Sequence, residues 1–150
     1  MPQKRCVYIP EGSNPLQEKF INYIMKQGKK NVARKIFKDT LEIIGKNDKA
    51  PEKLFEAAID NIKPAVEVRA KRIGGAVYQI PVEVKPERQL MLAFRWILGA
   101  ARSKRNAPMA KKLASELMLA MNNEGAAIKK KEDTIKMAQA NKAFAHYAKY

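Results

Sequence analysis

Apolar residues recur at every second position in only one stretch of the chain, from Val66 to Val84. A period of two predicts β-strands, and this stretch divides into two arms around Gly74 and Gly75. Paired glycines accept the positive φ angles that a tight reversal between twisted strands requires. Pro81 cannot donate a ladder hydrogen bond, which favours a two-stranded ribbon with open edges. The pattern therefore predicts a protruding β-hairpin over residues 66–84.

Outside this stretch, apolar residues recur at intervals of three and four, the spacing of amphipathic α-helices. Asn14-Pro15 is typical of an N-cap and first helical residue, and Asn31 is expected to cap the next helix. The six predicted helices begin near Leu16, Asn31, Pro51, Pro86, Pro108 and Lys129, and the sixth runs through Ile135 to Tyr150. We expect a mainly α single domain over residues 16–150, with the hairpin between the third and fourth helices. Residues 1–15 are expected to form an irregular basic arm.

Charge narrows the possible functions. Thirty Lys and Arg residues against fifteen Asp and Glu residues give a formal net charge of +15, which favours a polyanionic partner. Nucleic acid is a better candidate than a membrane surface, because no apolar run approaches the length of a bilayer span. The first fifteen residues lack the apolar segment of a signal peptide, so we expect a cytoplasmic protein.

The basic residues gather at helix ends and on helix faces, where they can neutralise phosphates without reading base sequence. Arg88, Arg95 and Arg102 are seven residues apart and share one face of the fourth predicted helix. An ordinary solvated face is the alternative for these arginines and for the cluster of basic residues from Lys26 to Lys35. The candidate phosphate-binding residues are Lys4, Arg5, Lys26, Lys29, Lys30, Arg34, Lys35, Arg95, Arg102, Lys104, Arg105, Lys111, Lys112, Lys129, Lys130 and Lys131.

Catalytic motifs are missing from the sequence. It has no glycine-rich phosphate loop with its lysine, no nucleophile elbow and no metal-ligand spacing. Cys6 is the single cysteine and cannot form an internal disulfide, and His146 has no visible catalytic partner. We therefore expect no enzyme activity, no metal and no cofactor. The aromatic residues near the C-terminus can stack on a base, dock on a neighbouring protein or fold back on the core.

Four segments carry a resemblance to a known family: KFINYIMKQGKK, AIDNIKPAVEVRAKRIGGAVYQIPVEV, RWILGAARSK and NNEGAAIKKKEDTIKMAQANKAFAHY. In this order they resemble protein seven of the bacterial and organellar small ribosomal subunit. The resemblance implies a structural protein that binds the 3′ major domain of small-subunit rRNA and nucleates assembly of the head. It also implies a position near the exit-site tRNA and the mRNA path, in a cytoplasmic or organellar ribosome.

The resemblance further assigns roles to particular residues. The hairpin residues near tRNA and mRNA would be Arg69, Lys71, Arg72, Gly74, Gly75 and Tyr78. The C-terminal residues that would meet a neighbouring protein are His146, Tyr147 and Tyr150. The implied neighbours are small-subunit proteins nine and eleven. The chain is expected to be monomeric off the ribosome. Ile135 stands where the family often has a histidine, so no role of that histidine is carried over.

Two other classes of function remain open at this point. A DNA-architectural protein could place the β-arm in a minor groove, although a tip of Gly74, Gly75 and Ala76 offers no bulky wedge. An RNA-modifying enzyme would need a catalytic constellation that the sequence does not contain.

Overall fold

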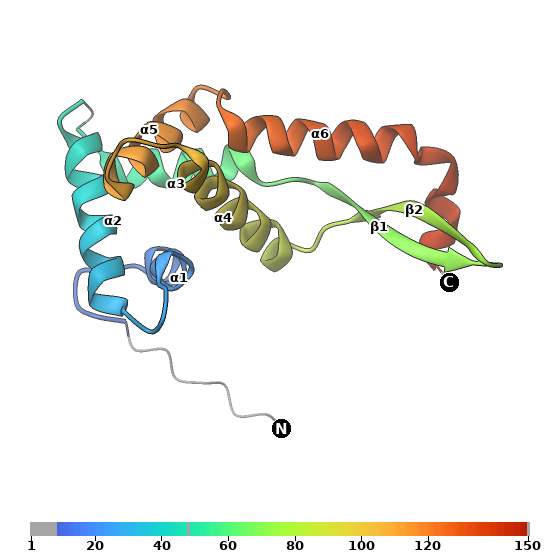
Figure 1. Cartoon of the computed structure of the whole chain (residues 1–150), viewed down its shortest axis with the longest axis horizontal. Coiled ribbons are helices and arrows are strands. Elements are labelled where there is room, and N and C mark those ends of the chain that lie inside the picture. Colours follow the sequence, from blue (N-terminus) through green and yellow to red (C-terminus); the bar gives the residue numbers. More distant parts are fainter. Residues whose placement is uncertain (1–8, 48, 150) are drawn as a thin grey trace.

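A computed structural model describes residues 9–47 and 49–149. Within these ranges the chain forms six α-helices, one 3₁₀ helix and a two-stranded sheet (Figure 1). The mainly α fold with a hairpin between the third and fourth helices is confirmed, but the helices number seven rather than six. In chain order the elements are α1 (Pro15–Ile24), α2 (Lys30–Gly45), α3 (Pro51–Ile62), β1 (Val66–Ile73), β2 (Ala76–Glu83), α4 (Pro86–Ser103), α5 (Met109–Met121), α6 (Ala126–Ala140) and η1 (Lys142–Lys149).

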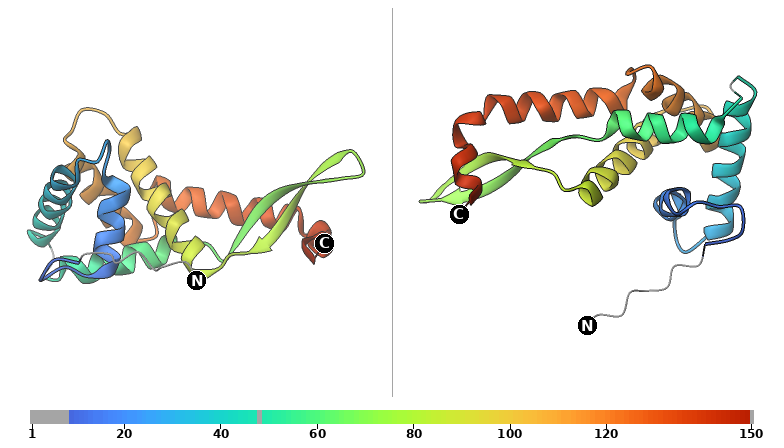
Figure 2. Two further views of the ribbon diagram at one scale, coloured as in Figure 1. Left: turned by 90° about the horizontal axis from the view of Figure 1, so that it is seen from below. Right: turned by 180° about the vertical axis from the view of Figure 1, so that it is seen from behind.

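Helices α1 to α5 pack around one apolar core at the end of the molecule away from the hairpin tip (Figures 1 and 2). Phe20 of α1 is fully buried at its centre. Its ring centroid lies 5.0 Å from those of Phe55 and Phe94 and 5.7 Å from that of Phe37. These rings come from α2, α3 and α4, so one aromatic cluster joins four helices.

The ends of the helices test the capping predictions. The Asn14 side chain accepts hydrogen bonds from the backbone N–H groups of Leu16 and Gln17, at 2.7 and 3.3 Å, and confirms the predicted cap. The predicted cap at Asn31 is wrong, because α2 already begins at Lys30. Gln27 and Gly28 have φ angles of 55° and 72° and reverse the chain just before that helix. Asn31 therefore falls inside the first turn.

The hairpin has the predicted two-residue turn. Gly74 and Gly75 have φ angles of 58° and 88°, as a type I′ turn requires, and Ile73 pairs with Ala76. This register places the odd-numbered residues of β1 on the same face as the even-numbered residues of β2. Glu67 thus lies opposite Val82 and shares a face with Ile80, which is 1% exposed. The polar side of the first strand and the apolar side of the second form one face.

Helix α6 and η1 lie along the hairpin and support it far beyond its base (Figures 1 and 2). The prediction of one helix continuing to Tyr150 is wrong, because α6 ends at Ala140. The Asn141 side chain donates a 2.8 Å hydrogen bond to the Met137 carbonyl and satisfies the helix end. Tyr150 lies outside the described residues, and none of the described helices is long and apolar enough to cross a bilayer.

The tighter winding of η1 suits its contact with the hairpin. Side chains three residues apart eclipse one another in a 3₁₀ helix, which brings Phe144 and Tyr147 onto one side. Their ring centroids lie 5.1 and 5.8 Å from that of Tyr78 on β2. The terminal aromatic residues therefore fold back on the chain, but onto the hairpin rather than onto the core.

Candidate nucleic-acid interface

Some of the predicted phosphate-binding residues are held by a buried carboxylate. Glu18 of α1 has a side chain only 2% exposed, and its Oε2 lies 3.1 Å from Arg34 Nη2 and 3.4 Å from Lys30 Nζ. The hydroxyl of Ser13 donates to Oε1 at 3.0 Å. A carboxylate this deeply buried needs opposite charge close by, so Lys30 and Arg34 join α2 to α1. About one third of each cationic side chain remains exposed.

Two further predicted cations have structural partners. Lys104 Nζ lies 2.8 Å from Oε1 of Glu116, which is buried, and donates to the Ser115 hydroxyl at 3.0 Å. Lys131 Nζ donates to the Asn61 carbonyl at 2.7 Å. These bonds link α5 to the end of α4, and α6 to α3, so both lysines contribute to the fold.

The ends of α1 and α4 and the start of α2 form the first basic surface. Lys26, Lys29 and Arg102 line a groove of about 310 Å³ whose floor is apolar. The Arg102 guanidinium donates to the carbonyls of Tyr23 and Ile24, at 3.4 and 3.5 Å, in the last turn of α1. A cation at a helix C-terminus complements the helix dipole. The structure thus brings together charges that lie far apart in the sequence.

A second basic surface lies where α4 meets the first turn of α6, with Arg95 and Lys130 on its rim. Among the described residues, neither side chain has a hydrogen-bond or ion-pair partner. Eight more predicted cations also have no such partner in the described chain. With Arg95 and Lys130 included, the ten residues are Lys26, Lys29, Lys35, Arg72, Arg95, Arg105, Lys111, Lys112, Lys129 and Lys130.

The three arginines spaced along α4 have different surroundings. Arg95 and Arg102 line separate grooves, and Arg88 binds a carboxylate at the base of the hairpin. The stripe that the sequence predicted is therefore divided among three local environments. Lys4 and Arg5 lie outside the described residues.

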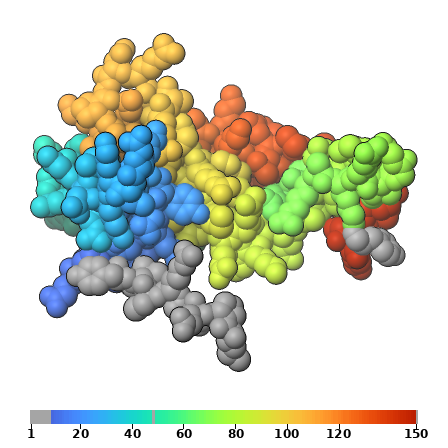
Figure 3. Space-filling view, turned by 60° about the horizontal axis from the view of Figure 1, so that its bottom comes forward, coloured from blue at the N-terminus to red at the C-terminus, as the bar shows by residue number. Residues whose placement is uncertain are grey.

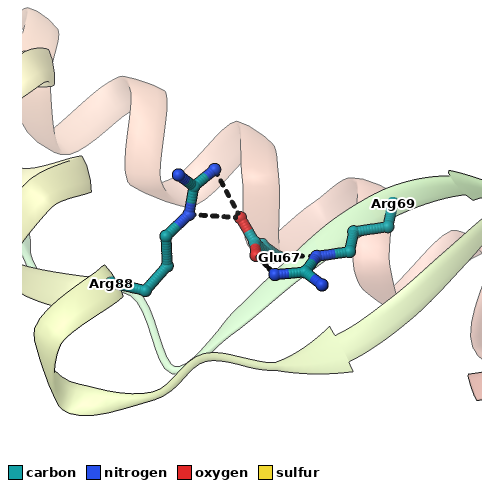
Figure 4. Close-up of polar contacts among 3 residues, drawn as sticks. All are labelled: Glu67, Arg69 and Arg88. Atoms are coloured by element: carbon teal, nitrogen blue, oxygen red, sulfur yellow. Dashed lines mark hydrogen bonds and ion pairs between the residues drawn. The ribbon is translucent and has the colours of Figure 1, made fainter. Parts of the chain in front are cut away.

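Glu67 joins the hairpin to the helical body. Its side chain is 10% exposed and lies between two guanidinium groups, one from β1 and one from the first turn of α4 (Figure 4). Oε1 accepts from Nε and Nη2 of Arg69 at 3.2 and 3.1 Å. Oε2 accepts from Nε and Nη2 of Arg88, both at 3.4 Å. Arg69, predicted as a contact for tRNA or mRNA, is thus already paired within the chain.

The outer part of the hairpin protrudes from the body formed by α1 to α5, with C-terminal residues against one side (Figure 3). Lys71 Nζ donates to the Tyr147 carbonyl at 3.3 Å, and Tyr78 packs on Phe144 and Tyr147. Arg72, Gly74 and Gly75 are exposed at the tip. The six predicted hairpin residues therefore divide into three that hold the arm in place and three that are free for contact.

His146 is exposed on η1. Its Nδ1 lies 3.1 Å from the Ala143 carbonyl, and its ring centroid lies 4.0 Å from that of Tyr147. Among the described residues, no three His, Cys, Asp or Glu side chains gather in a way that could hold a metal ion.

Three residues at these surfaces were not predicted from the apolar and basic patterns: Glu18, Glu67 and Trp96. Glu18 lies inside the first predicted helix, where nothing local distinguishes a buried glutamate from an exposed one. Glu67 could have been found, since a two-residue turn fixes the register and places it opposite Val82. Trp96 lies one position from a predicted arginine, and only the crossing of α4 and α6 makes it part of a groove.

Together, a helical body with separated basic surfaces and a braced, protruding hairpin define a protein built to bind a folded polyanion. Comparison with known proteins gives the family. Residues 1–142 match the model of the family described as ribosomal protein S7p/S5e, and this chain belongs to that family.

Three bacterial relatives are each described as "Small ribosomal subunit protein uS7". The one from Nitratiruptor sp. is 56% identical over 148 residues, covering 97% of this chain and 95% of its own. The one from Rhodopirellula baltica is 53% identical over 142 residues (93% and 90%), and the one from Nitratidesulfovibrio vulgaris strain Miyazaki F is 48% identical over 148 residues (98% and 95%). The chain is thus a structural component of the ribosome and not an enzyme, which removes the RNA-modifying and DNA-architectural alternatives.

Proposed function

We propose that the chain binds the 3′ major domain of small-subunit rRNA, nucleates assembly of the head and holds its hairpin near the exit-site tRNA and the mRNA path. The observation that carries this proposal is the separation of the cations into two groups. One group is bonded within the chain, either to the carboxylates of Glu18, Glu67 and Glu116 or to backbone carbonyls, and the other has no partner in the described chain.

The second group is suited to RNA phosphates. An unpaired exposed lysine or arginine can neutralise a phosphate without first breaking an ion pair within the protein, and each such contact releases counterions. Apart from Arg72 on the hairpin, these cations lie on or beside α1, α2, α4, α5 and α6, so one RNA would have to follow several helices to reach them all. A folded RNA domain does this better than a straight duplex, because its helices and junctions offer phosphates in several directions.

The hairpin is suited to positioning. Glu67 fixes its base, and Lys71 and Tyr78 fix its middle against η1, so Arg72 is presented at the end of a held arm. Holding the arm before binding lowers the entropy lost when a tRNA or mRNA meets the tip. We therefore assign assembly to the helical surfaces and exit-site contact to the hairpin.

We also propose small-subunit proteins nine and eleven as neighbours of a chain that is monomeric off the ribosome. The exposed His146 ring is the part of η1 best placed to meet protein eleven, because Tyr147 is already engaged by the hairpin. A His146→Ala variant should bind purified protein eleven more weakly, with unchanged affinity for the rRNA domain. If the variant and the wild type bound protein eleven equally well, the proposed contact of His146 with that protein would be wrong.

The central test is binding of the full chain to the isolated 3′ major domain and to duplex DNA across a salt titration. Lys26→Gln combined with Lys29→Gln should lower the salt slope of rRNA binding by roughly two phosphate contacts. Lys46→Gln combined with Lys53→Gln removes the same charge from exposed lysines outside the proposed interface and should change the slope less. Equal affinity for duplex DNA, or equal effects of the two double variants, would overturn the proposal.

The two roles can also be separated in ribosomes. Arg72→Ala should leave incorporation into small subunits unchanged but weaken exit-site tRNA binding or mRNA handling, because Arg72 has no structural partner among the described residues. Failure of this variant to enter subunits would instead make the arm an assembly contact.

A further inference from the structure

A groove between α4 and the start of α6 combines an indole ring, small residues and two cations. Its volume is about 340 Å³, and its lining residues are Arg95, Trp96, Gly99, Ala100, Ala126 and Lys130. They fall into three pairs four residues apart, which places each pair on one face of its helix. No acidic side chain lines the groove.

Most of the lining between the two cations is apolar. Trp96 is half-buried and contributes an indole ring, while Gly99, Ala100 and Ala126 contribute little bulk. A Cβ atom placed on Gly99 would meet nothing within 4 Å, so the helix surface is open there. Glycine within a helix is less favourable than alanine. Among the described residues, no neighbour packs closely enough against this position to require a glycine.

The rim of the groove is positive. Arg95 and Lys130 are both exposed and have no partner among the described residues. The first turn of α6 begins at Ala126 with no side-chain cap, so backbone N–H groups add partial positive charge at that end. An aromatic floor between two cations suits a ligand that is flat in one part and anionic in another.

We propose that this groove holds one unstacked base of the bound RNA on the indole of Trp96, with the neighbouring phosphates on Arg95 and Lys130. The inference rests on the proposed rRNA function and adds a site to it. Unpaired bases of folded RNA commonly stack on aromatic side chains, and any base offers a suitable face. A volume of about 340 Å³ lies in the range of sites that hold small ligands, which suits a single base.

The test uses Trp96 as its own reporter, because it is the single tryptophan of the chain. Stacking of a base on the indole should quench its fluorescence and shield it from acrylamide when the full chain binds the 3′ major domain. Gly99→Leu places a side chain in the groove and replaces a poor helix former by a good one, so the fold should be retained. Ala140→Leu introduces the same side chain at an exposed position at the other end of α6 and serves as the control.

We expect Gly99→Leu to lower affinity for the rRNA domain at least about fivefold and to remove most of the quenching, with an unchanged salt slope because no charge is lost. Ala140→Leu should behave as the wild type. Trp96→Leu, measured by gel shift, should lower affinity by a similar factor and provides a second route if Gly99→Leu does not fold.

Failure of this inference can be distinguished from failure of the proposed function. Tight rRNA binding with unchanged Trp96 emission, or with wild-type affinity of both groove variants, would overturn the base-binding groove alone. Loss of any preference for the rRNA domain in the wild type would overturn both. Quenching by a ribosomal protein in place of the RNA would assign the groove to a protein side chain and also overturn the inference.

Discussion

Replacing Glu67 by glutamine should loosen the hairpin without unfolding the helical body. The substitution keeps the size of the side chain but removes the charge that holds Arg69 and Arg88, whose side chains are 67% and 38% exposed. Solvent screening limits the more exposed pair to roughly 0.5 kcal/mol and the other to about 1 kcal/mol. The sum of about 1.5 kcal/mol corresponds to roughly a tenfold increase in the opening of the arm.

Amide hydrogen exchange can measure this opening strand by strand. Exchange of the amides in β1 and β2 should accelerate about tenfold in Glu67→Gln, whereas amides in α3 and α4 should keep their wild-type rates. Glu83→Gln is the matched control, because Glu83 is exposed on the same hairpin and has no partner among the described residues. Equal acceleration in both variants would mean that net charge, rather than the two ion pairs, controls the arm and would refute the reasoning.

Three further predictions concern the aromatic core, the hairpin turn and the packing of η1 on the hairpin. Phe20→Ala should lower the free energy of unfolding by about 3–5 kcal/mol in a urea titration, because it empties the centre of the aromatic cluster; a loss below about 1 kcal/mol would contradict the packing. Gly75→Val should cost about 1–2 kcal/mol within the hairpin alone, since its φ of 88° disfavours a β-branched residue, and Ala76→Val should be tolerated. Tyr147→Ala should accelerate amide exchange in η1 and β2 while leaving the urea midpoint unchanged, because the ring packs on Tyr78; a shifted midpoint would make η1 part of the cooperative core.

Local patterns were enough to predict most of the fold. The alternation and the paired glycines located the hairpin at residues 66–84, and the strands span Val66–Ile73 and Ala76–Glu83. Pro51 and Pro86 begin helices as predicted, because a fixed φ and a missing N–H suit the first helical position. The break at Asn141 was missed, since it depends on a side-chain bond to the Met137 carbonyl and on contacts of η1 with a distant strand.

The candidate site was less predictable than the fold. Composition identified the cations, but which of them are neutralised depends on tertiary contacts between elements far apart in the chain. Lys104 meets Glu116 because α4 and α5 pack together, and Lys131 meets the Asn61 carbonyl because α6 crosses α3. Such contacts between distant elements cannot be predicted from the local periodicity of the sequence. The position of Glu67 on the hairpin, in contrast, could be predicted from the sequence. The length of the turn fixes the register of the strands, and this register places Glu67 on the same face as the apolar side of β2.

The support of the hairpin by α6 and η1 has a consequence for synthesis. A growing chain emerges from its N-terminus, so both strands are made well before the segments that lie along them. A two-stranded ribbon is only marginally stable in water, and Tyr78 has no Phe144 or Tyr147 to pack against until those residues appear. The helical core of α1 to α5 can form during this interval while the arm stays loose. The part of the molecule proposed to meet tRNA and mRNA is therefore among the last parts of a newly made chain to become ordered.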